Sequence, residues 1–210
     1  MSEVIDRHFM SVFPTYIFKC SVDDMSLCDE LEDGVRKLWE AGNGSFVKKT
    51  KFISYDNLQT MEDFNKLNEI VLNEANGILD FLKVIRDDHY ISCMWANVTD
   101  SSHTHMVHIH PNSYLSGILY LKTPEKCGLT AFGDPRPGAR IIQPDYYEVN
   151  ETNGGTFRNV PKKGDMLMWH SWLPHGVEHS EDDSEQERIA IAFNVMIKGK
   201  ARTMTQSIDF

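Results

Sequence analysis

The hydrophobic pattern of the chain changes near residue 87, and this change limits the folds that the chain can adopt. Before this point, apolar residues recur at helical spacing in two segments, about 26–40 and 60–81. After it, short runs rich in apolar and β-branched residues alternate with turns rich in Gly and Pro. Helices followed by many short strands indicate a mainly β fold, a sandwich or jelly roll with the N-terminal helices packed on one face.

The boundaries of the early elements follow from capping residues and composition. An aromatic and β-branched run predicts a first strand at 13–20. Ser26 is the expected N-cap of the first helix and Gly42 its stop, while the second helix is expected from Thr60 or Met61 to Phe81. The polar stretch 42–55 is interpreted as part of a substrate-facing loop.

The second part of the chain reads as the β core of a single domain. The expected strands are residues 89–98, 106–110, 116–121, 128–132, 155–160, 165–169 and 189–197. The 210 residues fit one domain of ordinary size, with a helical part at about 1–87 and the β core at about 88–200.

Charge and cysteine usage narrow the classes of function. The 31 acidic and 21 basic side chains give a formal charge of −10, which disfavours general binding of nucleic acid. No apolar run reaches the roughly 18 residues that a membrane span needs, and no secretory signal is evident. The four cysteines are scattered without a CxxC pair, as is typical of free thiols in a reducing compartment. We therefore expect a cytoplasmic protein without a membrane partner.

Four of the nine histidines lie between positions 103 and 110. In a strand, residues i and i+2 point to the same face, so His108 and His110 are expected to project together and could bind one metal ion. Imidazole nitrogen suits iron, zinc, copper or nickel. The alternative is a solvated pair on an exposed strand.

A second element adds to the case for a site. His175 follows the apolar run 164–174, and Arg188 opens the apolar strand 188–194. A buried guanidinium must be paired, and a bound dicarboxylate would match its planar fork. A structural salt bridge with an acid among residues 181–187 would serve equally well.

An ordered set of short motifs resembles the Fe(II)/2-oxoglutarate-dependent oxygenase superfamily, in particular a prolyl-hydroxylase-like branch found in bacteria and phages. The motifs that carry the resemblance are Trp95-Ala96-Asn97, His108-Ile109-His110-Pro111, Ser116-Gly117, Asp134-Pro135-Arg136, Ser171-Trp172-Leu173-Pro174-His175 and the run from Arg188 to Asn194. They cover about half of the chain, roughly Trp95 to Ile197. No single motif is decisive, but the order of the set is specific.

This resemblance implies a double-stranded β-helix, the cupin-like jelly roll, with iron bound inside one end. His108 and His175 match the two metal histidines of the superfamily. Arg188 matches the basic residue that anchors the distal carboxylate of 2-oxoglutarate. Tyr120 falls where related prolyl hydroxylases place a tyrosine that binds the same carboxylate, although a packing role for this tyrosine is an equal alternative.

The chain departs from the superfamily at His110, where most members carry an Asp or Glu. Three neutral imidazoles leave the charge of a ferrous ion uncompensated, so metal affinity and redox potential should differ. His110 is the expected third ligand. The alternatives are an outer position for His110 with water or a displaced acid such as Asp134 as ligand, and His105 as a ligand in its place.

The resulting function hypothesis is a hydroxylase-type dioxygenase that uses Fe(II), O₂ and 2-oxoglutarate as cosubstrate, and releases succinate and CO₂. Its substrate would be a small molecule or a peptidyl residue, and the oligomeric state is open, with a homodimer as one option. Two other hypotheses remain: a three-histidine cupin-type dioxygenase that does not use 2-oxoglutarate, and a metal-binding β-sandwich without catalysis.

Overall fold

The computed structural model describes residues 8–46, 50–100, 103–180, 186–202 and 207–209. Its helical elements are α1 (Met25–Glu40), η1 (Leu58–Thr60), η2 (Glu62–Phe64) and α2 (Asn65–Phe81). Its strands are β1 (Ile17–Ser21), β2 (Gly44–Ser45), β3 (Thr50–Ser54), β4 (Asp88–Asp100), β5 (His105–His108), β6 (Leu115–Lys122), β7 (Thr130–Gly133), β8 (Thr156–Asn159), β9 (Asp165–His170), β10 (His175–Val177), β11 (Glu187–Lys198), β12 (Lys200–Arg202) and β13 (Ser207–Asp209).

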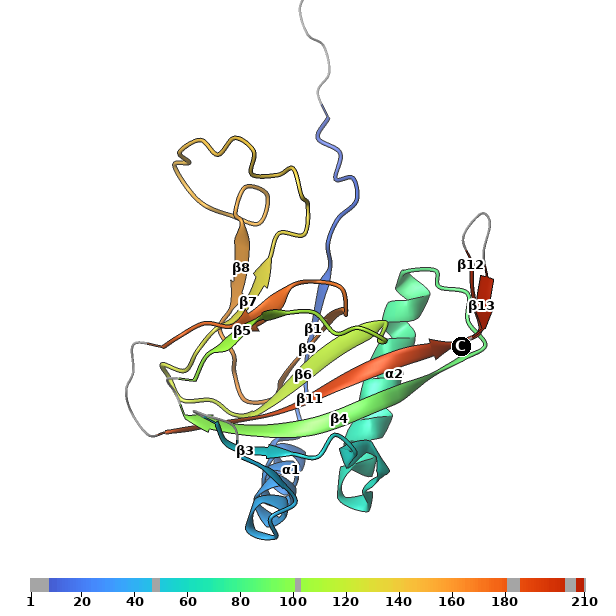
Figure 1. The fold of residues 1–210 in the computed structure, drawn as a ribbon, viewed down its shortest axis with the longest axis vertical. Helices are drawn as coiled ribbons and strands as arrows, with labels where there is room; N and C mark the ends of the chain where they lie inside the picture. The colour runs from blue at the N-terminus through green and yellow to red at the C-terminus, as the bar shows by residue number, and fades with distance from the viewer. Residues whose placement is uncertain (1–7, 47–49, 101–102, 181–185, 203–206, 210) are drawn as a thin grey trace, which may run out of the picture.

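Two antiparallel sheets form the body of the molecule, as the sequence predicted. The large sheet has the strand order β1-β9-β6-β11-β4-β3-β2, and the small sheet has the order β5-β10-β7-β8. Helices α1 and α2 cover the large sheet on the side away from the small one (Figure 1). The order of layers is therefore helices, large sheet, small sheet, which confirms the mainly β jelly-roll architecture with helices on one face.

The strict alternation of side chains along β11 separates two environments. Ile189, Ile191 and Phe193 belong to the core between the large sheet and the helices. Arg188 and Asn194 have the opposite parity and face the small sheet, because successive side chains of a strand point to opposite faces. The core on that second side is small, so part of the space between the sheets is lined by polar groups.

Neither helix begins at the residue that the capping signals predicted. The N-cap of α1 is Asp24, whose carboxylate accepts hydrogen bonds from the backbone N–H groups of Ser26 and Leu27. Asp and Ser are both good N-caps, and two such residues so close together left the choice open from sequence. The stop at Gly42 is confirmed, with a φ of 71° that suits glycine. The predicted first turns of the second helix are the two 3₁₀ turns η1 and η2, and α2 itself begins only at Asn65.

The interpretation of residues 42–55 as a polar loop is wrong in part. β2 and β3 form in this stretch, and β3 pairs antiparallel with β4 at one side of the large sheet. Residues 47–49 lie outside the described residues. The run Thr50–Ser54 has only two large apolar residues, of which Phe52 is buried against Trp39 of α1. Tertiary packing therefore makes a strand from a segment with a weak local signal.

Gly117 lets the ring of Phe193 lie across β6, and we expect a large loss of stability when it is replaced. A Cβ at this position would lie 2.3 Å from the Phe193 ring and 2.8 Å from the carbonyl oxygen of Leu167. Because Phe193 is fully buried, the ring has little room to move. Gly117→Ala should lower the free energy of unfolding in urea by about 1–3 kcal/mol, the usual cost of overpacking.

Gly77→Ala is the matched control for this substitution. Gly77 lies on an exposed position of α2, and a Cβ there would meet nothing within 4 Å. Its replacement should leave stability unchanged or raise it by roughly 0.5–1 kcal/mol, because alanine favours the helix. Equal unfolding free energies for the wild type and Gly117→Ala would show that Phe193 can repack freely.

Candidate metal centre

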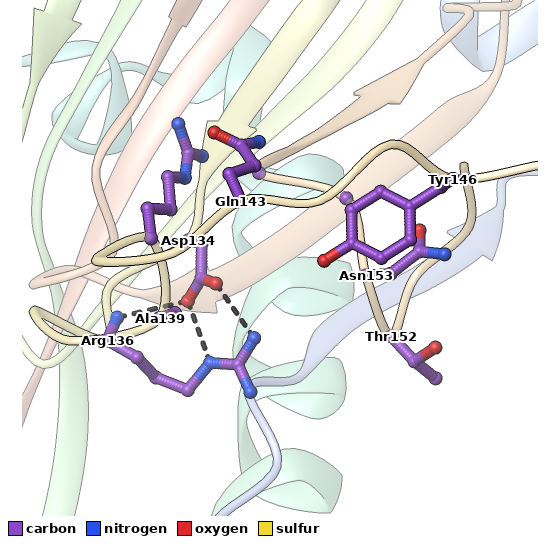
Figure 2. A pocket seen from close by; sticks show the side chains of 10 residues that line it. Asp134, Arg136, Ala139, Gln143, Tyr146, Thr152 and Asn153 are labelled. Atoms are coloured by element: carbon purple, nitrogen blue, oxygen red, sulfur yellow. Dashed lines mark hydrogen bonds and ion pairs between the residues drawn. The ribbon is translucent and has the colours of Figure 1, made fainter. Parts of the chain in front are cut away.

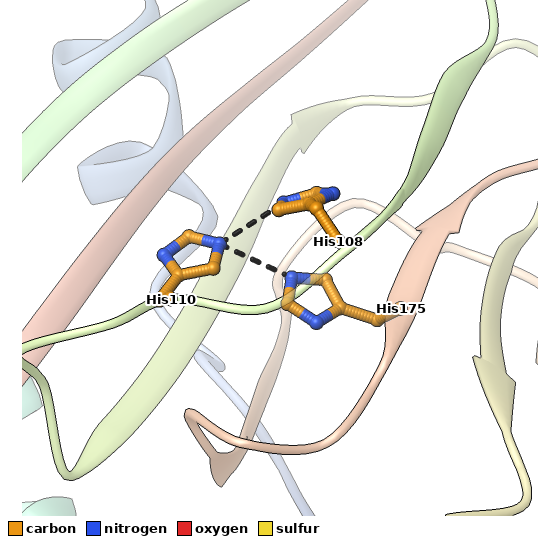
Figure 3. A group of neighbouring side chains, drawn as sticks. All are labelled: His108, His110 and His175. Carbon is orange, nitrogen blue, oxygen red and sulfur yellow. Dashed lines mark hydrogen bonds between the residues drawn. The ribbon is translucent and has the colours of Figure 1, made fainter.

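The small sheet brings the expected histidines together at one of its ends. In the register of β5, β10 and β7, His175 is the partner of both His108 and Phe132. His110 follows two residues after His108, and its backbone N–H donates to the carbonyl of Ser171. Figure 3 shows the three imidazoles turned toward one another from these segments.

The three imidazoles form a compact group of potential ligands, and they are the only such group found among the described residues. The Nε2 atom of His110 lies 3.0 Å from Nε2 of His108 and 3.2 Å from Nε2 of His175. With metal–nitrogen bonds of about 2.1 Å, nitrogens at right angles around one ion lie about 3.0 Å apart, and tetrahedral nitrogens about 3.4 Å. The two observed spacings therefore suit nitrogens that bind one ion at adjacent positions, with further positions of the ion open to other ligands.

Backbone carbonyls set the tautomers of two of these rings. Nδ1 of His108 lies 2.9 Å from the carbonyl oxygen of Met106, and Nδ1 of His175 lies 2.8 Å from that of Leu173. A carbonyl only accepts, so each Nδ1 carries the proton and each Nε2 has a free lone pair. The indole Nε1 of Trp169 is also 3.2 Å from Nδ1 of His175, but a protonated Nδ1 cannot accept, so we read that contact as ring packing. Lone pairs that face one another repel unless a cation lies between them.

The surroundings keep the imidazoles of His110 and His175 neutral, which is the form that binds a metal. Burial lowers the pKa of His175 to about 3, with the neighbouring histidines acting in the same direction. Burial also lowers the pKa of His110, and so does the neighbouring His108, whereas a hydrogen bond to Asn194 opposes the shift. Both rings are therefore uncharged at neutral pH, and no proton needs to leave them before an ion can bind.

The strand predicted at 106–110 ends earlier, and His110 lies beyond it. β5 stops at His108, so the argument from alternation along one strand does not place His110. The loop instead turns the ring back toward its partners, and Trp95 stacks on it with ring centroids 5.8 Å apart. His105 stacks on His108 at 4.4 Å but is not part of the group of potential ligand atoms.

Arg188 is buried between the sheets without a counter-charge among the described residues. Only 4% of it is exposed, and its Nε and Nη2 atoms have no hydrogen-bond partner there. Its guanidinium lies over the ring of Tyr120, with Cζ 5.2 Å from the centroid. The neighbouring Glu187 pairs with Arg36 of α1 instead, while residues 181–185 lie outside the described residues. Tyr120 and Cys127 are its hydrogen-bond partners, but both are neutral side chains. A buried guanidinium without a counter-charge is costly, and a bound carboxylate would compensate it.

Tyr120 extends the polar lining from Arg188 toward the histidines. It is fully buried, its hydroxyl lies 2.6 Å from Oγ1 of Thr130, and burial raises its pKa, so it is a neutral donor. Thr130 precedes Phe132, the partner of His175, by two residues, or about 7 Å along β7 on the same face. The lining thus leads from the guanidinium to the imidazoles within one space.

Sequence reasoning missed several polar residues of this space. Thr130 and Asn159 approach the hydroxyl of Tyr120, and the Nδ2 atom of the buried Asn159 has no hydrogen-bond partner among the described residues. Ser116 and Asn194 lie near His110, inside two of the recognised motifs. The available signal was a polar residue at an inward position of an apolar strand, the same signal that singled out Arg188.

Asp134 does not complete the group of histidines. Both of its oxygens accept hydrogen bonds from the side chain of Arg136, and one also accepts from the backbone N–H of Arg136 (Figure 2). It begins the long loop between β7 and β8, where it helps line a small polar hollow with Arg140, Gln143 and Tyr146. The turn geometry expected of Asp-Pro-Arg is what the structure has. Because β7 ends just past Phe132, this loop leaves from the histidine end of the small sheet.

The sequence matches one family model, described as "Putative 2OG-Fe(II) oxygenase", over residues 93–194. Over these residues the chain belongs to this family. The matched residues run from β4 to β11 and include all three histidines and Arg188. The family implies Fe(II) and 2-oxoglutarate. A search of curated proteins gives no match.

Solved structures similar to this chain include two prolyl hydroxylases and HygX. A prolyl-4-hydroxylase from Pseudomonas putida has a TM-score of 0.64 at 13% identity, over 88% of this chain and 94% of the other. The viral collagen prolyl hydroxylase vCPH from Paramecium Bursaria Chlorella virus-1, in a 2OG complex, has a TM-score of 0.56 at 14% identity, over 87% and 97%. HygX from Streptomyces hygroscopicus, with nickel and 2-oxoglutarate bound, has a TM-score of 0.57 at 14% identity, over 87% and 83%. At such identities the likeness shows the fold.

The residues present fit the groups that the family implies. Three lone pairs converge where an ion could bind, and a buried guanidinium with unpartnered Nε and Nη2 atoms lies in the same inter-sheet space. Among the described residues no carboxylate joins the histidines, so the ligand set departs from two histidines and one carboxylate. No helix in the described part of the chain is long and apolar enough to cross a membrane.

Proposed function

We propose that the chain is an Fe(II)- and 2-oxoglutarate-dependent oxygenase that hydroxylates a small-molecule or peptidyl substrate. His108, His110 and His175 would hold the iron, and Arg188 with Tyr120 would hold the distal carboxylate of 2-oxoglutarate. Bound together, iron and cosubstrate supply the oxidising chemistry, in which O₂, 2-oxoglutarate and a C–H bond give succinate, CO₂ and a hydroxylated product. The protein supplies binding, orientation and polarity.

Each named residue has a separate task in this proposal. The histidines offer three nitrogens to one ion, which leaves coordination positions for the cosubstrate and for O₂. Arg188 offers a charged fork and Tyr120 a neutral hydroxyl, both preorganised before binding because their side chains are buried. The buried ring of Trp169 contacts His175 and restricts the access of water from that side.

One observation carries the proposal: a buried guanidinium without a counter-charge among the described residues and a converging set of lone pairs share one inter-sheet space. A purely structural sandwich would gain nothing from either feature, since each is destabilising until a ligand compensates it. An anion with a metal-chelating end, such as a keto acid, compensates both at once. This argument favours a bound dicarboxylate over a metal-binding sandwich without catalysis.

The proposal is tested under anaerobic conditions with purified apoprotein. Fe(II) is added first and 2-oxoglutarate second, and the visible spectrum is followed for the weak charge-transfer band of a chelated keto acid. We expect the band to appear and to saturate with 2-oxoglutarate. Succinate, which lacks the keto group, is the control and should produce no band.

Two other results would redirect the assignment. Iron binding without a band would favour the three-histidine dioxygenase that works without 2-oxoglutarate, with Arg188 binding an acidic group of the substrate. A protein that binds neither Fe(II) nor Co(II) would rule out the oxygenase function. Substrate screening becomes meaningful only after the band is seen, by following succinate formation with each candidate.

A further inference from the structure

His110 differs from the other two histidines in what holds it. His108 and His175 belong to β5 and β10, where the strand ladder fixes the backbone. His110 lies outside the regular strands, in the loop between β5 and β6. An imidazole on a loop needs other contacts to keep its lone pair directed at the ion.

Three buried polar residues supply such contacts; we call Ser116, Ser171 and Asn194 the serine–asparagine cluster. The hydroxyls of Ser116 and Ser171 lie 2.8 Å apart, and Ser116 donates to Oδ1 of Asn194 over 2.8 Å. The three residues are 1%, 1% and 6% exposed. The cluster is thus a connected polar group inside the space between the sheets.

The cluster contacts His110 at both ends. The carbonyl of Ser171 accepts the backbone N–H of His110 over 3.0 Å. The side chain of Asn194 lies close enough to the ring of His110 to raise its pKa, which is the effect of a hydrogen-bond acceptor. These contacts therefore form a closed set. They run from the His110 backbone to Ser171, then to Ser116 and Asn194, and back to the His110 imidazole. Such a closed set restrains the position of the loop and the rotation of the imidazole together.

The orientation of the Asn194 amide decides which tautomer His110 adopts. Nδ2 of Asn194 donates to Sγ of Cys93 over 3.2 Å, which directs Oδ1 toward the hydroxyl of Ser116. A carbonyl oxygen has two lone pairs, so Oδ1 can also accept the Nδ1 proton of His110. The proton is then held on Nδ1, and Nε2 is free to face His108 and His175, as it does at 3.0 and 3.2 Å.

We propose that Asn194, held by Ser116, is the positioning residue that makes His110 a metal ligand in place of a carboxylate. This inference rests on the proposed metal site but concerns a residue that binds neither iron nor cosubstrate. In this proposal Asn194 holds the Nδ1 proton of His110, as the backbone carbonyls of Met106 and Leu173 hold those of the other two rings. Outer partners of this kind fix the ring orientation and tautomer of a ligand histidine, and their loss costs about 10–100-fold in metal affinity.

The test measures Co(II) affinity by calorimetry and the Co(II) ligand-field spectrum, both without turnover. Asn194→Leu keeps the size of the side chain and removes the acceptor, so its Kd should rise about 10–100-fold, with a changed spectrum. Asn194→Asp restores an acceptor and should bind Co(II) at least as tightly as the wild type. Ser116→Ala, which leaves Asn194 in place but frees its amide, should weaken binding less than Asn194→Leu does.

Asn68→Leu is the matched control, because the half-buried Asn68 lies on α2 and its amide donates to the carbonyl of Gln59 over 2.8 Å. It should leave the Co(II) affinity unchanged. An Asn194→Leu protein with wild-type affinity and spectrum would overturn the inference, and so would equal losses in Asn194→Leu and Asn68→Leu. If Asn194→Leu does not fold, the Co(II) affinities of Ser116→Ala and Asn194→Asp test the inference instead. Wild-type affinity in Ser116→Ala would then overturn it. A wild type that binds no metal refutes the proposed function itself, and the inference with it.

Discussion

Replacement of His175 by alanine should abolish metal binding at the concentrations that saturate the wild type. The ring is 6% exposed, and its Nε2 is one of three converging nitrogens. Loss of an outer partner already costs about 10–100-fold in affinity, so loss of a ligand should cost more than about 100-fold. Calorimetric titration with Co(II), and with Fe(II) under anaerobic conditions, measures this directly.

His89→Ala separates this effect from the general loss of a histidine. His89 lies on β4, where its ring nitrogen contacts the carbonyl oxygen of Leu72. It is not part of the group of potential ligands. Its replacement should leave the metal affinity as it is. A His175→Ala protein that still bound the ion within a few-fold of the wild type would show that the three imidazoles are not the ligand set.

Arg188→Met should remove the affinity for 2-oxoglutarate while metal binding persists. Removing one partner of a buried, hydrogen-bonded charge pair costs about 2–5 kcal/mol, or roughly 30- to several-thousand-fold in Kd. The anaerobic charge-transfer band should therefore need far more 2-oxoglutarate to saturate, at an unchanged Fe(II) affinity. Arg158→Met is the control, because Arg158 pairs with Glu178 at the surface.

The stability of the same variant tells the two interpretations of Arg188 apart. In the apoprotein the guanidinium is buried without a counter-charge among the described residues, so an apolar replacement should leave the unfolding free energy unchanged or raise it. If the role of Arg188 is structural, Arg188→Met should clearly lower the free energy of unfolding and leave the affinity for 2-oxoglutarate unchanged. Urea unfolding of the two apoproteins, side by side with the 2-oxoglutarate titration, decides between them.

Local patterns predicted the layers of this fold but not the details of the loops. Nearly continuous apolar runs in segments such as 165–169 and 189–197 predict strands at nearly the observed positions, because burial on both faces leaves a strong signal. Thr50–Ser54 has no such signal, since its strand exists through pairing with β4 and the packing of Phe52. The weak capping signals before α2 similarly hid two 3₁₀ turns.

The candidate site was predictable in its residue types and only partly in its geometry. The ordered motifs pointed to His108, His110, His175 and Arg188, and the structure places the three histidines together and Arg188 in the same inter-sheet space. Alternation along a strand was the wrong reason for His110, because its ring is directed by a loop. Asn194 could not be assigned a role from sequence, because its partners Ser116 and Cys93 come from β6 and β4.

The separation of the two faces of the large sheet has a consequence for how such a protein can change. The main apolar core joins the helices to one face, whereas the polar groups of the site belong to the other. A substitution that alters the ligand set or the cosubstrate pocket therefore leaves most of the packing untouched. The ligand set and the pocket lining can thus change one residue at a time while the fold is kept. A designer could place a carboxylate at position 110, or change the residues around Tyr120, without redesigning the fold.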